Sequence, residues 1–255
     1  MSEPITRAIV RRPPESFAKG ITTAGLGMPD AGRAREQHEA YVEALRSCGL
    51  AVDVLPPLEA YPDSCFVEDT AVFLDASVVL ARPGAPSRRG EERATRETLA
   101  RHRPVEAIEA PGTLDGGDVL RAGDRWFVGI STRTNEAGAA ALGRAIEREG
   151  GIWKPVPLAG GLHLKSDVNR IGGGRLLVTP SFAGREEFRG VERITVPGDE
   201  KYAANSLEVN GRLLVPAGFP RTRALLEGTG MDVIVVDVSE FQKMDGGLTC
   251  LSLRF

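Results

Sequence analysis

Residues that build specialised sites are scarce in this 255-residue chain. It has three cysteines, Cys48, Cys65 and Cys250, which show no CxxC spacing and form no disulfide framework. Such a set argues against structural zinc and against a cystine-stapled secreted fold. We therefore expect no metal, no cofactor and a reducing cytoplasmic location.

Long apolar runs and an excess of positive charge are also missing. No stretch approaches the roughly 18 apolar residues of a membrane span, and the apolar run within residues 5–12 is too short for a secretory signal. The net charge of −3 gives no support to nucleic-acid or anionic-membrane binding, because both favour basic surfaces. We therefore expect neither a nucleic-acid nor a membrane partner.

The chain does contain a weak internal repeat. Five times, a polar or glycine-bearing stretch leads into a short apolar strand, at residues 66–74, 115–129, 167–179, 204–216 and 246–255. Hairpin signals occur at 122–124, 172–174 and 210–211. Helical patterns occupy residues 33–48, 90–102, 135–149 and 220–227. Further β-rich runs lie at 51–55, 105–108, 152–156, 194–196 and 233–238.

This repeat predicts an α/β fold. Its units start about 40 to 50 residues apart, which is the range of propeller blades and other arrays. We interpret residues 1–255 as one catalytic domain, a fivefold pseudo-symmetric α/β propeller of β-β-α-β units around a central active-site cavity. A doubly wound sheet is the alternative, and spacing alone slightly favours it.

The last six residues, 250–255, contain the first candidate for chemistry. Cys250 opens an alternating apolar run, which predicts a strand held in a sheet. The preceding pair Gly246-Gly247 lets a ligand approach the backbone closely. A thiol beside such an opening is a candidate nucleophile, whereas most lone cysteines are small buried hydrophobes.

Candidates for a base and its partner are few. His38 lies on the apolar stripe of a predicted helix, which favours packing, and His102 lies at a helix end, where a cation is favourable. His163 lies between two leucines on a short predicted strand and is the remaining imidazole. Asp115 and Asp118 place two carboxylates on a glycine-rich turn, although such turns often need glycine only to bend.

Five further charged residues indicate a zwitterionic ligand. Glu68 and Asp69 sit between apolar runs, where a carboxylate is costly unless it meets a cation. Together with Asp63, they suit a planar guanidinium. Arg88 and Arg133 stand at strand-to-helix junctions, where they can bind a carboxylate, although solvated surface arginine is the default interpretation.

Several segments together resemble one known family. They run in family order from residue 62 to the end: PDSCFVEDTAV, RPGAPSRRGE, TLDGGDVL with STRTNEAGA, GLHLKS, KYAANSLEVN and DGGLTCLSLRF. The chain thus resembles the dimethylarginine dimethylaminohydrolases (dimethylargininases) of the guanidino-group-modifying, or pentein, superfamily. That resemblance implies the fivefold α/β propeller fold and the hydrolysis of Nω-methylated arginine, both asymmetric dimethylarginine and monomethylarginine, to citrulline and an amine.

The resemblance also assigns roles to residues. It implies Cys250 as nucleophile, His163 as general acid and base, and Asp115 as the acid that completes the pair, without a metal. Its substrate-binding positions are Glu68 and Asp69 at the guanidinium, Asp63 near the amino-acid end, Arg88 and Arg133 at the carboxylate, Ile21 on a lid loop at the α-amino group, and the backbone carbonyls of Met244 and Asp245.

Other functions stay open at this point. Hydrolysis of free arginine to citrulline and ammonia keeps the fold, but arginine deiminases are longer and carry an inserted helical domain. A non-catalytic binding protein for arginine-like ligands and a Cys/His metal site are the alternatives from other classes. Adventitious zinc on Cys250 and His163 is a conceivable inhibitor. The sequence leaves the oligomeric state open, with a homodimer as the assembly considered.

Overall fold

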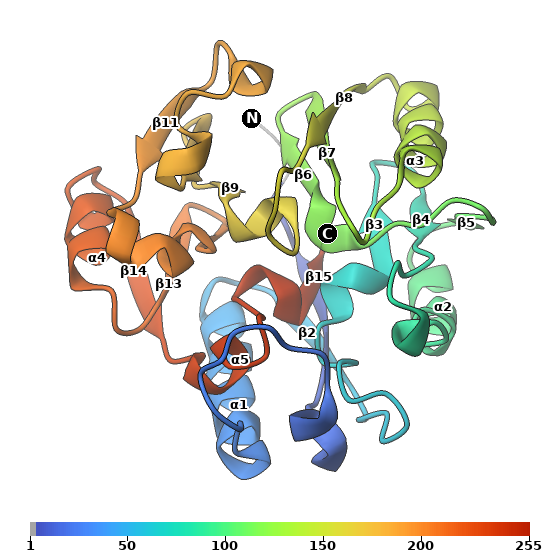
Figure 1. The fold of residues 1–255 in the computed structure, drawn as a ribbon, viewed down its shortest axis with the longest axis horizontal. Helices are drawn as coiled ribbons and strands as arrows, with labels where there is room; N and C mark the ends of the chain where they lie inside the picture. The colour runs from blue at the N-terminus through green and yellow to red at the C-terminus, as the bar shows by residue number, and fades with distance from the viewer. Residues whose placement is uncertain (1–3) are drawn as a thin grey trace. The chain divides into compact units, whose positions relative to one another are not determined.

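In the computed structural model of the chain, which describes residues 4–255, the strands form five separate three-stranded sheets (Figure 1). The strands are β1 (Arg7–Arg11), β2 (Ala51–Leu55), β3 (Ala71–Phe73), β4 (Val78–Leu80), β5 (Val105–Ala107), β6 (Val119–Ala122), β7 (Arg125–Ile130), β8 (Ile152–Pro157), β9 (Val168–Arg170), β10 (Arg175–Val178), β11 (Glu192–Thr195), β12 (Leu207–Val209), β13 (Arg212–Pro216), β14 (Asp232–Val236) and β15 (Ser252–Arg254).

All five sheets share one topology. In each, the middle strand pairs antiparallel with one neighbour and parallel with the other, as β4 does with β3 and β5. The three predicted hairpins connect β6 to β7, β9 to β10 and β12 to β13. Asn210 and Gly211 in the last of these have φ of 51° and 84°, the backbone that a tight hairpin turn requires.

The predicted helices are present with small shifts at their ends. They are α1 (Ala31–Ser47), α2 (Arg93–Ala100), α3 (Glu136–Arg148) and α4 (Pro220–Glu227), with a short α5 (Ser239–Gln242). The side chain of Asp30 accepts a hydrogen bond from the backbone N–H of Arg33 at 2.9 Å, and this cap explains why α1 starts two residues before the predicted position. No helix within residues 4–255 combines the length and apolar character of a membrane span.

The third repeat departs from the predicted β-β-α-β pattern. Only two short 3₁₀ turns, Pro180–Phe182 and Glu186–Phe188, connect β10 to β11, so the expectation of a helix in every unit is wrong here. Gly184, Gly190 and the proline at the start interrupt the segment, and no helical stripe of apolar residues spans it.

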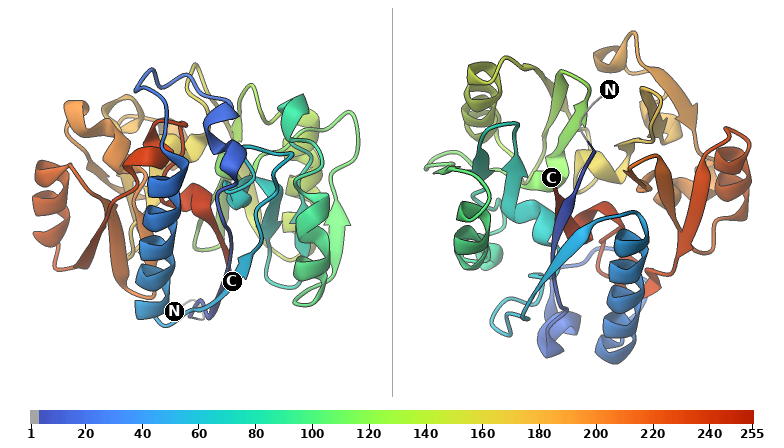
Figure 2. Two further views of the ribbon diagram at one scale, coloured as in Figure 1. Left: turned by 90° about the horizontal axis from the view of Figure 1, so that it is seen from below. Right: turned by 180° about the vertical axis from the view of Figure 1, so that it is seen from behind.

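The sheet that contains both ends of the described chain completes the repeat. β15 pairs antiparallel with β1, with Ile9 opposite Leu253, and β1 pairs parallel with β2 (Figure 2). Residues 7–11 were not predicted as a strand. They occupy the position that the second hairpin strand has in the other sheets, so the fifth unit is assembled from opposite ends of the sequence.

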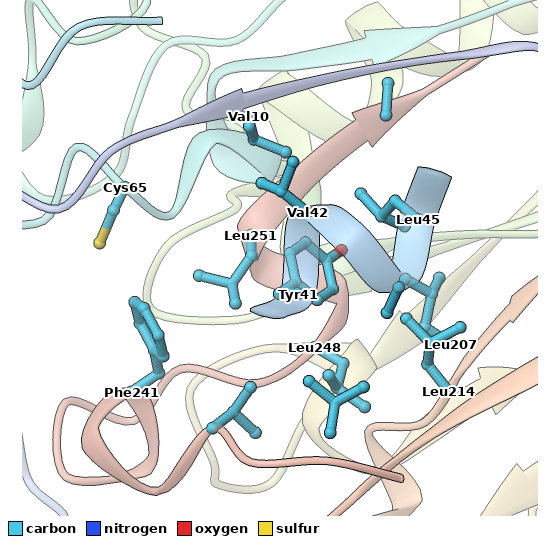
Figure 3. Close-up of a cluster of buried hydrophobic side chains, with 14 of the residues drawn as sticks. Val10, Tyr41, Val42, Leu45, Cys65, Leu207, Leu214, Phe241, Leu248 and Leu251 are labelled. Atoms are coloured by element: carbon cyan, nitrogen blue, oxygen red, sulfur yellow. The ribbon is translucent and has the colours of Figure 1, made fainter. Parts of the chain in front are cut away.

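The chain divides into two compact units, each with its own core. The first comprises the described residues up to Phe66 together with Ser166–Phe255, and the second comprises Val67–Lys165. In the first unit, Tyr41 and Leu45 of α1 pack with Leu248 and Leu251 of the C-terminal segment (Figure 3). The Tyr41 hydroxyl also lies 2.6 Å from the hydroxyl of Ser252, which fixes the start of β15.

The core of the second unit lies under α3. Leu142 and Ile146 of this helix pack with Val128 of β7 and Val79 of β4. α3 also contacts β8 directly, and Figure 1 shows the helix beside β7 and β8. The turns at the ends of the strands in this unit carry five charged candidates: Glu68 and Asp69 before β3, Arg88 after β4, Asp115 before β6 and Arg133 after β7.

Candidate active site

Two 3₁₀ turns of the second unit bring the predicted acids together. Val67–Thr70 carries Glu68 and Asp69, and Gly116–Asp118 packs against it. The N–H of Gly117 donates to Oδ1 of Asp69 at 2.9 Å. A Cβ on Gly117 would lie 2.7 Å from Nδ1 of His163, so only glycine lets the two turns and the imidazole pack this closely.

The buried acids meet cations, as the sequence required. Nη1 of Arg88 lies 2.6 Å from Oδ2 of Asp69, and Nη2 of Arg88 lies 2.8 Å from Glu91. Nζ of Lys165 lies 2.8 Å from Oε1 of Glu68. Burial raises the pKa of Asp69, but the charges of His163 and Arg88 outweigh that effect and lower it to about 2. Asp69 is therefore ionised at neutral pH.

His163 and Asp115 form a buried pair. Nε2 of His163 lies 3.0 Å from Oδ2 of Asp115, whose Oδ1 accepts the N–H of Gly84 at 2.9 Å. Burial lowers the pKa of His163, but the charge of Asp69 and the hydrogen bond to Asp115 oppose it and raise the pKa to about 9. The imidazole is therefore protonated at neutral pH and able to donate a proton.

Within the described residues, Arg133 brings a buried nitrogen without a hydrogen bond to the same cluster. It lies between β7 and α3, as predicted, with Nη1 3.6 Å from Oδ2 of Asp115. That nitrogen is buried and makes no hydrogen bond within residues 4–255. A buried donor without an acceptor is costly, so this group indicates a place for an anionic ligand.

In the first unit, a tightly held turn carries Cys250. The side chain of Asn205 accepts from the backbone N–H of Thr249 at 3.0 Å and donates to its hydroxyl at 3.1 Å. The N–H of Gly247 donates to Sγ of Cys250 at 3.4 Å. A Cβ on Gly247 would lie 2.6 Å from Cγ of Asn205, so the packing of this side chain requires glycine here, and the predicted approach of a ligand stays a prediction.

The remaining four candidates lie together in the first unit. The carboxylate of Asp63 accepts the N–H of Ile21 at 3.1 and 3.2 Å. Asp245 adopts a φ of 58° and accepts the N–H and the hydroxyl of Thr23 at 2.5 and 3.0 Å. Met244 is buried beside this turn. The predicted lid segment is thus tied at Ile21 to Asp63 and at Thr23 to Asp245, and only Asp245 is close to Cys250 in sequence.

The local structure at the two reactive candidates differs from the prediction. Cys250 lies in the 3₁₀ turn Thr249–Leu251, and the strand begins only at Ser252. His163 lies in irregular backbone and not on a strand, because the N–H of Leu164 bonds to the side chain of Asp118. His38 is buried in α1, which confirms the packing role expected for it.

Sequence reasoning gave no role to Lys165, Glu91 or Asn205, and it noted Asp118 only as the second carboxylate of the glycine-rich turn. Lys165 had a signal, because a lysine two residues after the candidate base can supply the cation that a buried acid needs. Glu91 and Asn205 had no signal of their own. Glu91 is three residues from Arg88 in an ordinary charged stretch, and the role of Asn205 depends on a contact across 44 residues.

One group in the cluster has metal-ligand chemistry. Asp69, Asp115 and His163 each bring one ligand atom within 4.8 Å of the others. These atoms already have partners, however. Arg88 and Gly117 hold Asp69, while Gly84 and His163 hold Asp115. A metal ion would have to displace these contacts next to two arginines, so the cluster is better suited to an organic cation.

Comparison with known proteins identifies close relatives. Residues 30–156 match the family model described as N,N dimethylarginine dimethylhydrolase, eukaryotic. The Pseudomonas aeruginosa N(G),N(G)-dimethylarginine dimethylaminohydrolase is 43% identical over 249 residues, which are 97% of this chain and 98% of that protein.

Two solved structures match over nearly the whole chain. A Cys-to-Ser mutant of the Pseudomonas aeruginosa enzyme with citrulline has a TM-score of 0.97 at 42% identity, covering 99% of this chain and 100% of that one. A His-to-Gly dimethylarginine dimethylaminohydrolase, as an adduct with S-methyl-L-thiocitrulline, has a TM-score of 0.96 at 42% identity, covering 98% and 100%. The predicted fold class, a fivefold α/β propeller, is confirmed by these matches and by the five repeated sheets.

Proposed function

We propose, from the premise that this chain belongs to the dimethylarginine dimethylaminohydrolase family, that it hydrolyses Nω-methylated arginine to citrulline and an amine. Asymmetric dimethylarginine yields dimethylamine, and monomethylarginine yields methylamine. The observation that carries the proposal is the set of buried, ionised acids next to a protonated imidazole in the second unit. Such a set binds a guanidinium and can protonate a departing amine.

Opposite charges in this cluster suit a zwitterionic substrate. The acids Glu68 and Asp69 can pair with the guanidinium of a methylated arginine, and the cation Arg133 can pair with its carboxylate.

Within this proposal, the two ends of the substrate have different partners. Glu68 and Asp69 hold the guanidinium plane by charge-assisted hydrogen bonds. The unsatisfied Nη1 of Arg133 supports a contact with the α-carboxylate. Arg88 is already paired with Asp69 and Glu91, so we assign Arg133 the stronger share of that contact. Asp63, Ile21 and the carbonyls of Met244 and Asp245 act at the amino-acid end.

The proposed chemistry is covalent. The thiolate of Cys250 attacks the guanidinium carbon, a C–S bond forms, and the C–N bond to the amine breaks as His163 donates a proton to the leaving nitrogen. His163, now neutral, takes a proton from water as the oxygen adds to the thiouronium carbon. The C–S bond then breaks, the remaining hydroxyl proton passes to the departed amine, and citrulline and the thiolate are released. Asp115 orients the imidazole through Nε2 and leaves Nδ1 for these transfers.

A product assay tests the proposed function. We expect the purified chain to release dimethylamine from asymmetric dimethylarginine and methylamine from monomethylarginine, each with stoichiometric citrulline. Free arginine serves as the comparison, with ammonia as its product. Ammonia release from arginine that is faster than amine release from both methylated substrates would replace this proposal with the deiminase reaction.

Arg133→Ala should separate the two ends of the substrate. Loss of one charge-assisted contact in a closed site costs about 2–4 kcal/mol, or roughly 30- to 1000-fold in kcat/KM for methylated arginine. A small methylated guanidine without a carboxylate should lose almost nothing. Asp69→Asn is the matched variant and should impair both substrates. Equal losses for both substrates in Arg133→Ala would mean that this arginine has only a structural role.

Three predictions from the sequence stay predictions. We propose that residues 1–255 act as one catalytic domain, of which residues 1–3 lie outside the described part. We further propose a cytoplasmic location and, as the assembly to be examined, a homodimer. None of these is needed for the chemistry above.

A further inference from the structure

Asp118 is a buried carboxylate for which the proposed chemistry has no use. It ends the 3₁₀ turn Gly116–Asp118 and is completely buried. A Cβ on Gly129, in the neighbouring strand β7, would lie 2.7 Å from its Oδ1, so the backbone approaches the carboxylate as closely as it can. Burial raises the pKa of Asp118, which makes the retention of an acid at this position costly.

The hydrogen bonds of Asp118 lead to three residues of the proposed site. Its Oδ1 accepts the backbone N–H of Leu164, the residue after His163, at 2.9 Å. Its Oδ2 accepts the hydroxyl of Ser131 at 2.7 Å, and the nearby hydroxyl of Thr134 lowers the pKa of the Asp118 carboxyl. Each of these partners fixes a different candidate.

Ser131 connects Asp118 to Arg133. The oxygen of its hydroxyl accepts the backbone N–H of Arg133 at 2.9 Å and that of Thr134 at 3.1 Å. Because this oxygen accepts from two donors, its proton is directed to Asp118. Thr134 makes the third connection, since its hydroxyl oxygen accepts the backbone N–H of Asp115 at 3.1 Å.

We infer that Asp118 is the positioning residue that holds the imidazole of His163, the guanidinium of Arg133 and the carboxylate of Asp115 in one arrangement. This inference rests on the proposed function, because it gives those three groups their roles in catalysis and binding. Asp118 itself touches no substrate in this scheme. It acts through Leu164, Ser131 and Thr134.

The arrangement requires two acceptor oxygens on one side chain. Leu164 offers an N–H to one oxygen, and Ser131 offers an O–H to the other. In Asp118→Asn, the amide nitrogen must face one of these donors, so one of the two bonds is lost even though the shape of the side chain is unchanged. The same substitution removes one of the negative charges that face His163, the others being Asp69 and Asp115. Arg88 pairs with Asp69, and Nη1 of Arg133 approaches the same Oδ2 of Asp115 that Nε2 of His163 contacts.

The first test follows the imidazole directly and needs no turnover. The chain has three histidines, so proton NMR titration resolves each of them, and His163→Gln assigns the signal. We expect Asp118→Asn to lower the pKa of His163 by about 1 unit. Asp124→Asn, in the exposed turn between β6 and β7, removes an acid from the same sheet and should leave the titration unchanged. A folded Asp118→Asn chain with an unaltered His163 titration would overturn the inference.

The second test isolates the connection to Arg133. Ser131→Ala should raise KM for asymmetric dimethylarginine about 10-fold and leave kcat within about 2-fold, because only the grip on the carboxylate is loosened. Ser131→Thr keeps the hydroxyl and should restore KM. Unchanged KM in Ser131→Ala would also overturn the inference.

The inference can still be tested if one variant does not fold or if the proposed function is wrong. If Asp118→Asn does not fold, the comparison of Ser131→Ala with Ser131→Thr tests the inference by itself. If the wild-type chain does not hydrolyse methylated arginine, the proposed function fails, whereas the NMR comparison still supports or rejects the coupling between Asp118 and His163.

Discussion

Cys250→Ser is expected to fold normally and to lose hydrolysis of methylated arginine by about 10⁴-fold or more. The hydroxyl of serine is far less acidic than a thiol, so it cannot supply the anionic nucleophile that the reaction needs at neutral pH. Serine is close to cysteine in size, and the turn is held by Asn205 and Thr249, so the fold does not depend on the sulfur. Steady-state assays of citrulline formation, together with the melting temperature, measure both effects.

The other two thiols provide the control. Cys48 ends α1, and Cys65 is buried in the core of the first unit. Cys48→Ala and Cys65→Ala should change kcat/KM by less than about 10-fold, with any loss appearing in the melting temperature instead. Near-normal turnover by folded Cys250→Ser would rule out the covalent mechanism.

His163→Gly is expected to stop turnover while substrate binding persists. Loss of a general acid and base typically costs 10²- to 10⁴-fold in kcat. The cavity left by the ring should accept exogenous imidazole, which should restore part of the rate. Because the amine cannot leave without the proton from His163, mass spectrometry should detect little adduct on Cys250 with methylated arginine. A variant that loses affinity but keeps kcat at saturation would show that His163 only shapes the site.

The pKa of His163, raised to about 9, also predicts a pH dependence. The protonated imidazole is the proton donor, so kcat/KM should fall as pH rises through about 9. The raised pKa also stabilises the folded chain. That contribution, on the order of 3 kcal/mol, is complete below pH about 6.5 and is lost as pH rises towards 9. Urea unfolding of wild type and His163→Gln over this range checks the sign, because only the wild type should show the loss.

The fold was predictable where the pattern is local. The helix at 220–227 and the strand at 51–55 match the predicted bounds, because a proline start and a β-rich run are local signals. The strand Arg7–Arg11 was missed, since its partners lie at the other end of the chain. The prediction of a helix between β10 and β11 was wrong. It applied the pattern of the other four units to a segment that glycine and proline interrupt.

The candidate site was also predictable only in part from the sequence. Residue types and family resemblance selected Glu68, Asp69 and His163. The prediction that the two buried acids need cations is confirmed, because Arg88 pairs with Asp69 and Lys165 pairs with Glu68. The sequence cannot reveal which arginine keeps an unsatisfied nitrogen. Nor can it reveal that one carboxylate connects three candidates, because hydrogen-bond partners are set by tertiary packing.

The pairing of β1 with β15 has a consequence for how the protein is made in the cell. Ala8 leaves the ribosome long before its partner Arg254, because almost the whole described chain lies between them. The edge of β1 that pairs with β15 must therefore stay unpaired while the other four sheets can already fold, although β2 is available to its opposite edge. Cys250 is translated shortly before Arg254, so nascent chains carry Asp115 and His163 before they carry the reactive thiol.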